Sequence, residues 1–356
     1  MKTLLRLLLK SQHQRNRSEP AQTDKGMTLV ELLVGAIMAF LILTPMLAFV
    51  VDMLNTDRRE QVKSNTEQDI QAAVDFIAQD LSQAIYIYDN IDINGGTRGT
   101  VTVTGIKSQL PESTDPNKTP ILVFWKRQQI KNAVPIEKAK KPSDCPPNGS
   151  SECNDTYVLS LVAYYQIKET TPNSTWCQPS GTPCPTRIVR YEIRDGVKNP
   201  YSSNSANPYY YDPGTNAYAP DGAFNPSFDI NKPTLNVTTV GKTADSKEVL
   251  VNYIDHSSGP LVTGSECTKA LGNPMDPTGV TPQRIPETTL RIPSPPPDNK
   301  VNGFYACVDT SKNIARVTIR GNSLRRIQTD ADYDDKKAAY FPTASVQVQG
   351  LGATGK

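Results

Sequence analysis

The fold of this chain is decided by residues 25–51, KGMTLVELLVGAIMAFLILTPMLAFVV. The 25 residues from Met27 to Val51 carry a single charge, Glu31, near their start. As an α-helix they would span about 37 Å, which is enough to cross the hydrocarbon core of a bilayer with some tilt. We therefore expect residues 27–51 to form a single transmembrane helix. The carboxylate of Glu31 needs a reason, because a charge inside a bilayer is costly.

Basic residues crowd the N-terminal side of this segment. Residues 1–26 contain six lysines and arginines against two acidic residues, whereas the whole chain of 356 residues has a net charge of +2. The positive-inside rule places residues 1–26 in the cytoplasm and everything after Val51 on the far side of the membrane. A cleaved secretory signal would have a small-residue cleavage site after the apolar run, but the chain continues DMLNTDRREQV. The near-neutral remainder argues against general nucleic-acid binding.

All six cysteines follow the apolar segment. An even number of cysteines in loop-like stretches such as SDCPPNGSSEC and WCQPSGTPC favours disulfides in an oxidising compartment. A zinc site is disfavoured, because the sequence has no CxxC motif and only two histidines. Six cysteines allow fifteen sets of pairs. Closeness in the sequence favours Cys145–Cys153, Cys177–Cys184 and Cys267–Cys307.

The segment that follows the apolar run keeps a helical pattern. Its apolar residues recur at spacings of three and four, which is typical of a helix that packs on a sheet. No proline or glycine occurs between Asp52 and Asn94. We therefore expect one helix from about Thr28 to Tyr88, with residues 52–89 as its amphipathic continuation. The apolar stripe consists of Ile70, Val74, Ile77, Leu81 and Ile85.

Beyond Asn94 the pattern changes to short runs rich in β-branched and aromatic residues, which predict strands. VLSLVAYYQIKE and TRIVRYEIRD indicate a hairpin with a disulfide-tied loop, and the second run places Arg190 and Glu192 on one face. VNGFYACVD and ARVTIRG, joined by TSKN, indicate a second hairpin. We predict an α+β fold, with a long N-terminal helix packed on a mostly antiparallel β-sheet with long disulfide-tied loops. Residues 90–356 would form an extracytoplasmic head.

Motifs of enzyme chemistry are missing from the sequence, which has no GxSxG, no HExxH and no P-loop. Only His256 lies outside the first 26 residues, so histidine-based triads are almost excluded, and we expect no enzyme and no cofactor. Asp330, Asp332 and Asp334 stand at alternate positions, as the ligands of calcium loops do, but the glycine and glutamate of an EF-hand are missing. A solvated acidic loop is the preferred interpretation.

Two further features could serve binding. A basic cluster could attract an anionic polysaccharide, DNA or lipid headgroups, although a solvated loop between strands is the preferred interpretation. Residues 198–236 are rich in tyrosine, whose rings could stack on sugars. The favoured interpretation is a loop that packs on the sheet. Residues 272–299 also have the composition of a loop. The basic cluster consists of Lys126, Arg127, Lys131, Lys138, Lys140 and Lys141.

Lys-Gly followed by Met-Thr-Leu-Val-Glu resembles the processing motif of type IV prepilins. The resemblance implies that a membrane peptidase cuts between Gly26 and Met27, methylates the new N-terminus and leaves the apolar helix as a filament core. Glu31 would be the fifth mature residue and would pair with the N-terminal amine of a neighbouring subunit; the alternative is a glutamate that reaches the cytoplasmic headgroups. The family more often has phenylalanine where Met27 stands. Pro45 falls where pilin helices commonly break.

The run QAAVDFIAQDLSQAIYIYDN, together with LVAYYQIKE and RIVRYEIRDG, resembles the PilW- and PulJ-like minor pilins and pseudopilins. The longer stretches ILTPMLAFVVDMLNTDRREQ and AQDLSQAIYIYD together are most similar to the cyanobacterial pseudopilins of hormogonium polysaccharide secretion. The resemblance implies a single-pass protein of the inner membrane, with an outward head, that enters a filament like those of type IV pili and type II secretion. The resemblance also implies that such a filament would support polysaccharide secretion and gliding motility.

The implied partners are the prepilin peptidase, other pilins and the inner-membrane assembly platform, with anionic polysaccharide as a further candidate; nucleic acid is not expected. An alternative function is that of a receptor-like minor pilin that binds DNA or surfaces for uptake or adhesion. A surface hydrolase on a plain anchor is disfavoured by the missing catalytic residues.

Overall fold

A computed structural model describes residues 28–145, 152–204, 208–210, 218–255, 265–276, 283–294, 303–329 and 331–352. The chain divides into two compact units, Met1–Arg58 and Arg59–Lys356. The predicted leader, with the cleavage residues Gly26 and Met27, lies outside the described residues, and so do Asp330 and His256. Parts of the loop regions 198–236 and 272–299 lie outside them as well.

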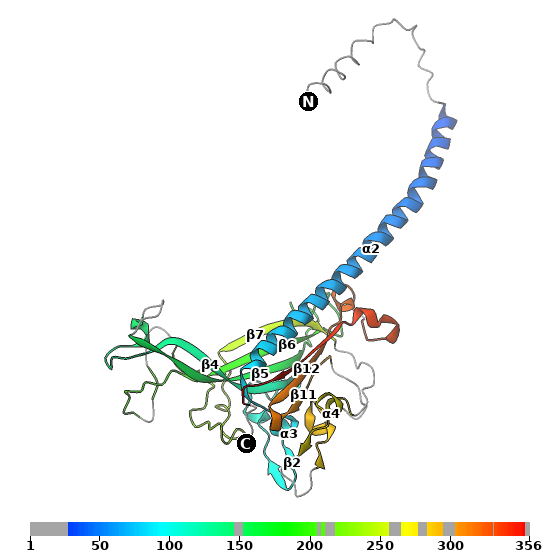
Figure 1. The fold of residues 1–356 in the computed structure, drawn as a ribbon. Coiled ribbons are helices and arrows are strands. Elements are labelled where there is room, and N and C mark those ends of the chain that lie inside the picture. Colours follow the sequence, from blue (N-terminus) through cyan, green and yellow to red (C-terminus); the bar gives the residue numbers. More distant parts are fainter. Residues whose placement is uncertain are drawn as a thin grey trace, which may run out of the picture. The chain divides into compact units, whose positions relative to one another are not determined.

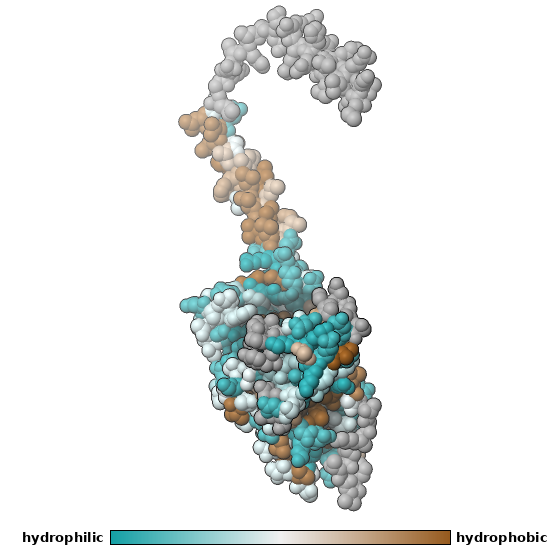
Figure 2. Space-filling model, turned by 90° about the vertical axis from the view of Figure 1, so that its left-hand side faces the viewer, coloured by the Kyte–Doolittle hydropathy of each residue, from teal (hydrophilic) through white to brown (hydrophobic). Residues whose placement is uncertain are grey.

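The first element is the helix α2 (Leu29–Ser82), which continues through Pro45. Every residue from 28 to 61 is exposed, and the apolar side chains among them form the brown stretch of helix in Figure 2. Among the described residues, α2 is the one helix that is long and apolar enough to cross a membrane. Exposure of so many apolar side chains to water is unfavourable, so this segment is suited to an apolar environment such as the interior of a bilayer.

The second part of α2 packs on the sheets of the head. Its buried side chains include Ile70, Val74, Ile77 and Leu81, which confirms four members of the predicted stripe. The end of one strand comes very close to the helix at Gly321, where a Cβ atom would lie 2.3 Å from the side chain of Ile70. A larger residue at this position would force the side chains of Ile70 and Thr66 to move.

The predicted end of the helix at Tyr88 is wrong. The helix ends at Ser82, and the strand β1 (Ala84–Ile87) follows directly and pairs antiparallel with β4. The residues Ile85, Tyr86 and Ile87 are β-branched or aromatic, and their strand preference is realised because a partner strand is available. The absence of proline and glycine permitted a longer helix but did not require one.

The head contains two main antiparallel sheets (Figure 1). The five-stranded sheet has the order β1-β4-β5-β6-β7, and the four-stranded sheet has the order β10-β11-β12-β13. Both predicted hairpins, β5–β6 and β11–β12, are confirmed. The strands are β4 (Lys118–Pro135), β5 (Cys153–Lys168), β6 (Thr186–Arg194), β7 (Ser246–Ile254), β10 (Arg291–Ile292), β11 (Phe304–Asp309), β12 (Ile314–Arg320) and β13 (Thr343–Gln349).

Shorter elements connect and cover the sheets. Two small hairpins stand apart from the main sheets, and the short helices lie in the connections. The hairpins are β2 (Gly96–Arg98) with β3 (Val101–Val103), and β8 (Met275–Asp276) with β9 (Gln283–Arg284). The helices are α3 (Asn90–Asn94), α4 (Glu266–Ala270), α5 (Glu287–Leu290), η1 (Lys107–Gln109), η2 (Pro142–Asp144), η3 (Thr310–Lys312), η4 (Leu324–Arg326) and η5 (Asp335–Tyr340).

One large core joins the helix stripe to both main sheets. Its largest fully buried side chains include Trp125, Phe124, Tyr164 and Tyr165. The predicted cysteine pairs are confirmed as three disulfides, Cys145–Cys153, Cys177–Cys184 and Cys267–Cys307. The fold is therefore the predicted α+β arrangement of a long apolar N-terminal helix packed against disulfide-tied antiparallel sheets.

Candidate functional site

The start of α2 positions Glu31 in the first helical turn. The hydroxyl of Thr28 accepts a hydrogen bond from the backbone N–H of Glu31 at 3.3 Å, so Thr28 caps the helix. A carboxylate in the first turn is favoured by the partial positive charge of the helix N-terminus. Within the described residues no cation pairs with Glu31. Its side chain is exposed and therefore available to a group from another molecule.

A buried group of charges fixes the other end of α2 to the five-stranded sheet. We call it the Asp80 cluster, and its centre is the carboxylate of Asp80 from the helix. Lys126 of β4 lies 2.9 Å from one oxygen, while Arg190 of β6 lies 2.7 Å from the other, which also accepts a hydrogen bond from Tyr164 at 2.6 Å. Glu192 completes the cluster, with one oxygen 2.7 Å from Arg190 and the other 3.4 Å from Lys126.

The strand register explains how these side chains meet. Arg190 and Glu192 are two residues apart on β6 and therefore share one face of the sheet. Tyr164 lies directly opposite Arg190 on β5. Asp80 follows Ile77 by three residues, so it lies on the buried face of the helix. The alternation on β6 was visible in the sequence, but nothing there identified its partner on the helix.

The Asp80 cluster contains two acidic and two basic groups, so its formal charges cancel. Burial alone would raise the pKa of Asp80, but the hydrogen bond from Arg190 and the charge of Lys126 outweigh burial and hold this pKa below its ordinary value. The same is true of Glu192. Burial alone would raise its pKa, but the charges of Lys126 and Arg190 lower it below its ordinary value. Ions buried this deeply must remain paired, because an unpaired buried charge costs several kcal/mol.

The structure divides the predicted basic cluster: Lys138, Lys140 and Lys141 lie in the connection after β4, as expected for a solvated loop, but the other three residues do not. Lys126 is buried in the Asp80 cluster, and residues up to Pro135 belong to strand β4. Lys140 pairs with Glu152 at 2.9 Å, and Arg127 lies over the ring of Tyr157 at 4.6 Å. Acidic side chains thus compensate Lys126 and Lys140. The sequence pattern could not reveal the partner of Lys126, because Asp80 lies on the helix, 46 positions earlier in the chain.

The acidic loop near the C-terminus offers no assembled metal site within the described residues, which hold no group of three or more metal-ligating side chains. The carboxylate of Asp334 accepts a hydrogen bond from the backbone of Lys336 at 3.0 Å and caps η5. Because Asp330 lies outside the described residues, a calcium site with Asp332 stays the alternative to the preferred solvated loop.

The described part of the tyrosine-rich stretch 198–236 packs on the head, as preferred. Phe228 stacks on Trp125 with 3.9 Å between the ring centroids, and Phe224 meets the same ring edge-on. The hydroxyl of Tyr88 donates a hydrogen bond to the carbonyl of Pro233. Through these contacts the stretch covers the five-stranded sheet around Trp125 of β4.

Comparisons of the chain with protein-family models, with curated proteins and with solved structures found no match. The class of the protein therefore rests on its own architecture. A long apolar N-terminal helix whose second part packs on an antiparallel sheet is consistent with a pilin-like fold.

Proposed function

We propose that this chain is a minor pseudopilin of a filament like those of type IV pili and type II secretion. The observation that carries the proposal is the single helix α2, which is apolar and exposed in its first part and packed on the head in its second. A plain membrane anchor would need only the first part. A rigid continuation into the head suits a subunit that is stacked by its helix, and the prepilin-like sequence KGMTLVE (residues 25–31) spans the start of that helix.

Assembly would proceed in three steps. A peptidase in the membrane cuts between Gly26 and Met27 and methylates the new amine. The apolar helix remains in the bilayer until it enters a bundle of similar helices. There the amine of Met27 from one subunit meets the carboxylate of Glu31 from the next, and each charge removes the cost of burying the other.

The cellular role follows from the resemblance to pseudopilins of polysaccharide secretion: the assembled filament would support polysaccharide export and gliding motility. The alternative role, a receptor for DNA, has less support because Lys126 and Lys140 of the proposed basic cluster are engaged in ion pairs. In this proposal the protein acts by assembling into a filament and not by catalysing a reaction.

The proposal is tested by mass spectrometry of the membrane-extracted protein and by a Glu31→Gln variant. We expect an N-methylated Met27 as the first residue, and we expect the variant to be inserted and cleaved normally but recovered in sheared filaments at a level at least about ten-fold lower, a loss of about 1.4 kcal/mol per contact. Glu60→Gln, on the same helix but outside the apolar part, is the matched control and should assemble normally. An unprocessed N-terminus, or normal assembly of Glu31→Gln, would contradict the proposal.

A further inference from the structure

The disulfide Cys177–Cys184, in the connection between β5 and β6, lies against a buried cation, Arg325 of η4. Arg325 is completely buried, with an exposed fraction of 0%. Its Nε donates a hydrogen bond to the carbonyl of Pro183 at 3.0 Å, and its Nη2 donates one to the carbonyl of Gly181 at 3.2 Å. The same Nη2 stands 3.6 Å from the sulfur of Cys177. The guanidinium is therefore fixed beside one sulfur of this disulfide.

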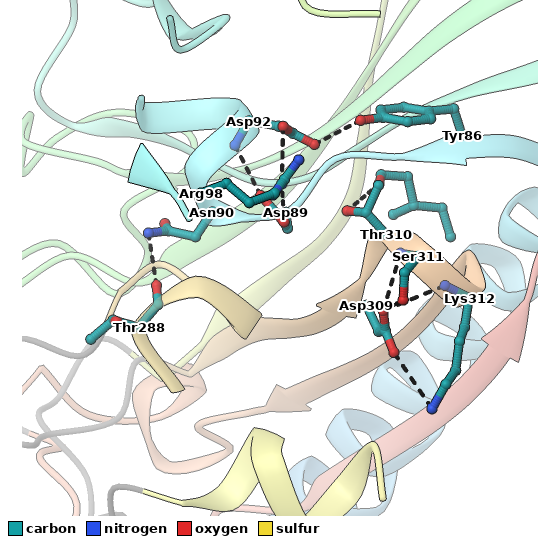
Figure 3. Close-up of polar contacts among 11 residues, drawn as sticks. Tyr86, Asp89, Asn90, Asp92, Arg98, Thr288, Asp309, Thr310, Ser311 and Lys312 are labelled. Carbon is teal, nitrogen blue, oxygen red and sulfur yellow. Dashed lines mark hydrogen bonds and ion pairs between the residues drawn. The ribbon is translucent and has the colours of Figure 1, made fainter. Parts of the chain in front are cut away.

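Arg325 has no acidic partner within the described residues. The usual arrangement is seen at Arg98, which lines a pocket beside α3 and contacts the carboxylates of Asp89 and Asp92 (Figure 3). Arg325 instead meets neutral carbonyls, and its Nη1 has no hydrogen-bond partner among the residues that the structure describes. Burial lowers the pKa of this guanidinium below its ordinary value. A buried charge without a counterion is costly, so a negative charge that formed here would be stabilised.

Reduction of Cys177–Cys184 would supply that negative charge. A thiol beside an arginine loses its proton more readily, and the resulting thiolate is an anion. The carbonyl oxygen of Gly181 also lies 3.2 Å from the sulfur of Cys177, but the hydrogen bond that it accepts from Arg325 offsets its effect on a negative sulfur. The oxidised pair thus leaves the guanidinium without an anion, whereas the reduced pair provides one. This difference favours reduction, because a disulfide whose reduced form is stabilised is a stronger oxidant.

The two sulfurs of this disulfide differ in their access to solvent. Cys184 keeps an exposed fraction of 7%, whereas Cys177 has none. Gln178, Ser180 and Thr182, which lie between the two cysteines, are exposed, so this loop is at the surface of the head. In thiol–disulfide exchange a thiolate attacks one sulfur, and the other sulfur leaves with the bonding electrons. Cys184 is therefore suited to be attacked, and Cys177 is suited to leave beside the guanidinium.

We infer that Cys177–Cys184 is a redox-active disulfide that exchanges with external dithiols, and that Arg325 stabilises the departing thiolate. One sulfur of the dithiol attacks Cys184, the bond between the two cysteines breaks, and its electron pair stays on Cys177. The second sulfur of the dithiol then attacks the first and releases Cys184. The dithiol loses two electrons and two protons; Cys184 takes up one proton, and the other goes to water. All three residues belong to the unit Arg59–Lys356, so this inference does not depend on filament assembly.

The experiment is an equilibrium titration of the full-length protein, in lipid nanodiscs, with mixtures of reduced and oxidised dithiothreitol. Free thiols are alkylated with N-ethylmaleimide, and peptide mass spectrometry gives the reduced fraction of each cysteine pair. The matched control is Cys145–Cys153, whose cysteines are 8 positions apart instead of 7 and whose sulfurs accept no hydrogen bond from a cationic side chain of the described residues. We expect Cys177–Cys184 to be half reduced at a ratio of reduced to oxidised reagent at least about ten-fold lower than the control.

Two variants connect this equilibrium to the guanidinium. Arg325→Gln removes the charge but keeps donors for the two carbonyls, and it should raise the ratio required for Cys177–Cys184 about ten-fold while that of Cys145–Cys153 stays unchanged. Arg325→Lys retains the charge and should stay close to the native protein. Equal ratios for the two disulfides in the native protein would overturn the inference even if Arg325→Gln failed to fold. An unchanged ratio in a folded Arg325→Gln variant would overturn it as well.

A monothiol shows which sulfur is attacked. Brief treatment with 2-mercaptoethanol, stopped by alkylation, should leave the reagent as a mixed disulfide on Cys184 and the alkyl group on Cys177. The reverse distribution would contradict the inference, because Cys177 would then not be the sulfur that leaves beside Arg325.

Discussion

Asp80 shows how a single side chain can connect a helix to three strands. It meets Lys126 from β4, Tyr164 from β5 and Arg190 from β6, all within 2.9 Å. The partners of the carboxylate offset the free-energy cost of taking it out of water. Without them, this desolvation cost would exceed any gain from packing. The cluster therefore contributes specificity: the helix can dock only where these three groups converge on one carboxylate.

We predict that Asp80→Ala lowers the free energy of unfolding by about 3–5 kcal/mol, because Lys126 and Arg190 remain buried with one acidic partner in place of two. The loss is measured by denaturant unfolding of the full-length protein. Asp75→Ala is the matched control: Asp75 is exposed on the same helix, accepts a hydrogen bond from Gln71 at 3.0 Å, and should change stability by about 0.5 kcal/mol or less.

The pH dependence gives a second readout for the same variant. The pKa of Asp80 is held below its ordinary value of 3.8, so the stability that this carboxylate contributes is present above about pH 4 and is lost as the pH falls through its folded-state pKa. The gap in stability between the native protein and Asp80→Ala should therefore shrink below this pH. A gap that stays constant on acidification, or one no larger than that of Asp75→Ala, would refute the ion-pair explanation.

At the scale of elements, periodicity predicted what is buried but not where the helix stops. The stripe from Ile70 to Leu81 was legible because each member follows another by three or four residues. The next member, Ile85, fits the same spacing, yet it belongs to β1 because pairing with β4 satisfies the backbone there. Tyr86 pairs with Trp125, which lies about 40 residues later in the chain. A pattern in the residues around Tyr86 carries no information about so distant a strand.

The disulfides should differ in their effect on stability according to the loops they close. Cys267–Cys307 spans 40 residues and ties α4 to β11, whereas Cys145–Cys153 spans 8. Loop-closure entropy predicts losses of about 4 and about 2.5 kcal/mol on replacing each pair by serine. Guanidinium unfolding of the two double variants under identical conditions gives the comparison, and an equal or larger loss for the 145/153 pair would contradict it.

At the scale of the whole molecule, the sequence predicted the architecture better than the sites. The apolar run, the alternating strands and the close cysteine pairs are local signals, and each was realised. The Asp80 cluster and the pocket beside α3 consist of residues from different elements, and their chemistry depends on distances that the chain acquires only on folding. Asp89 and Asp309, for example, stand 220 positions apart in the sequence and line one pocket.

The division of α2 between two units leads to a last prediction, about truncation. A fragment that begins at Arg59 keeps every buried residue of the helix, from Thr66 to Leu81, and loses only exposed ones. It should be soluble and unfold cooperatively, with a midpoint close to that of the full chain, as followed by circular dichroism. The apolar segment would then be dispensable for the fold and available for the proposed insertion and assembly.

A fragment that begins at Ala84 provides the contrast. It lacks the buried stripe, and four side chains of this kind each stabilise by about 1.5–3 kcal/mol, so the loss of about 6–12 kcal/mol is comparable to the whole stability of a domain. It also leaves Lys126 and Arg190 without Asp80. We expect this fragment to be unfolded or aggregated. If it folded as well as the fragment from Arg59, the helix would be an appendage of the head, and neither its buried stripe nor the Asp80 cluster would be needed for the fold.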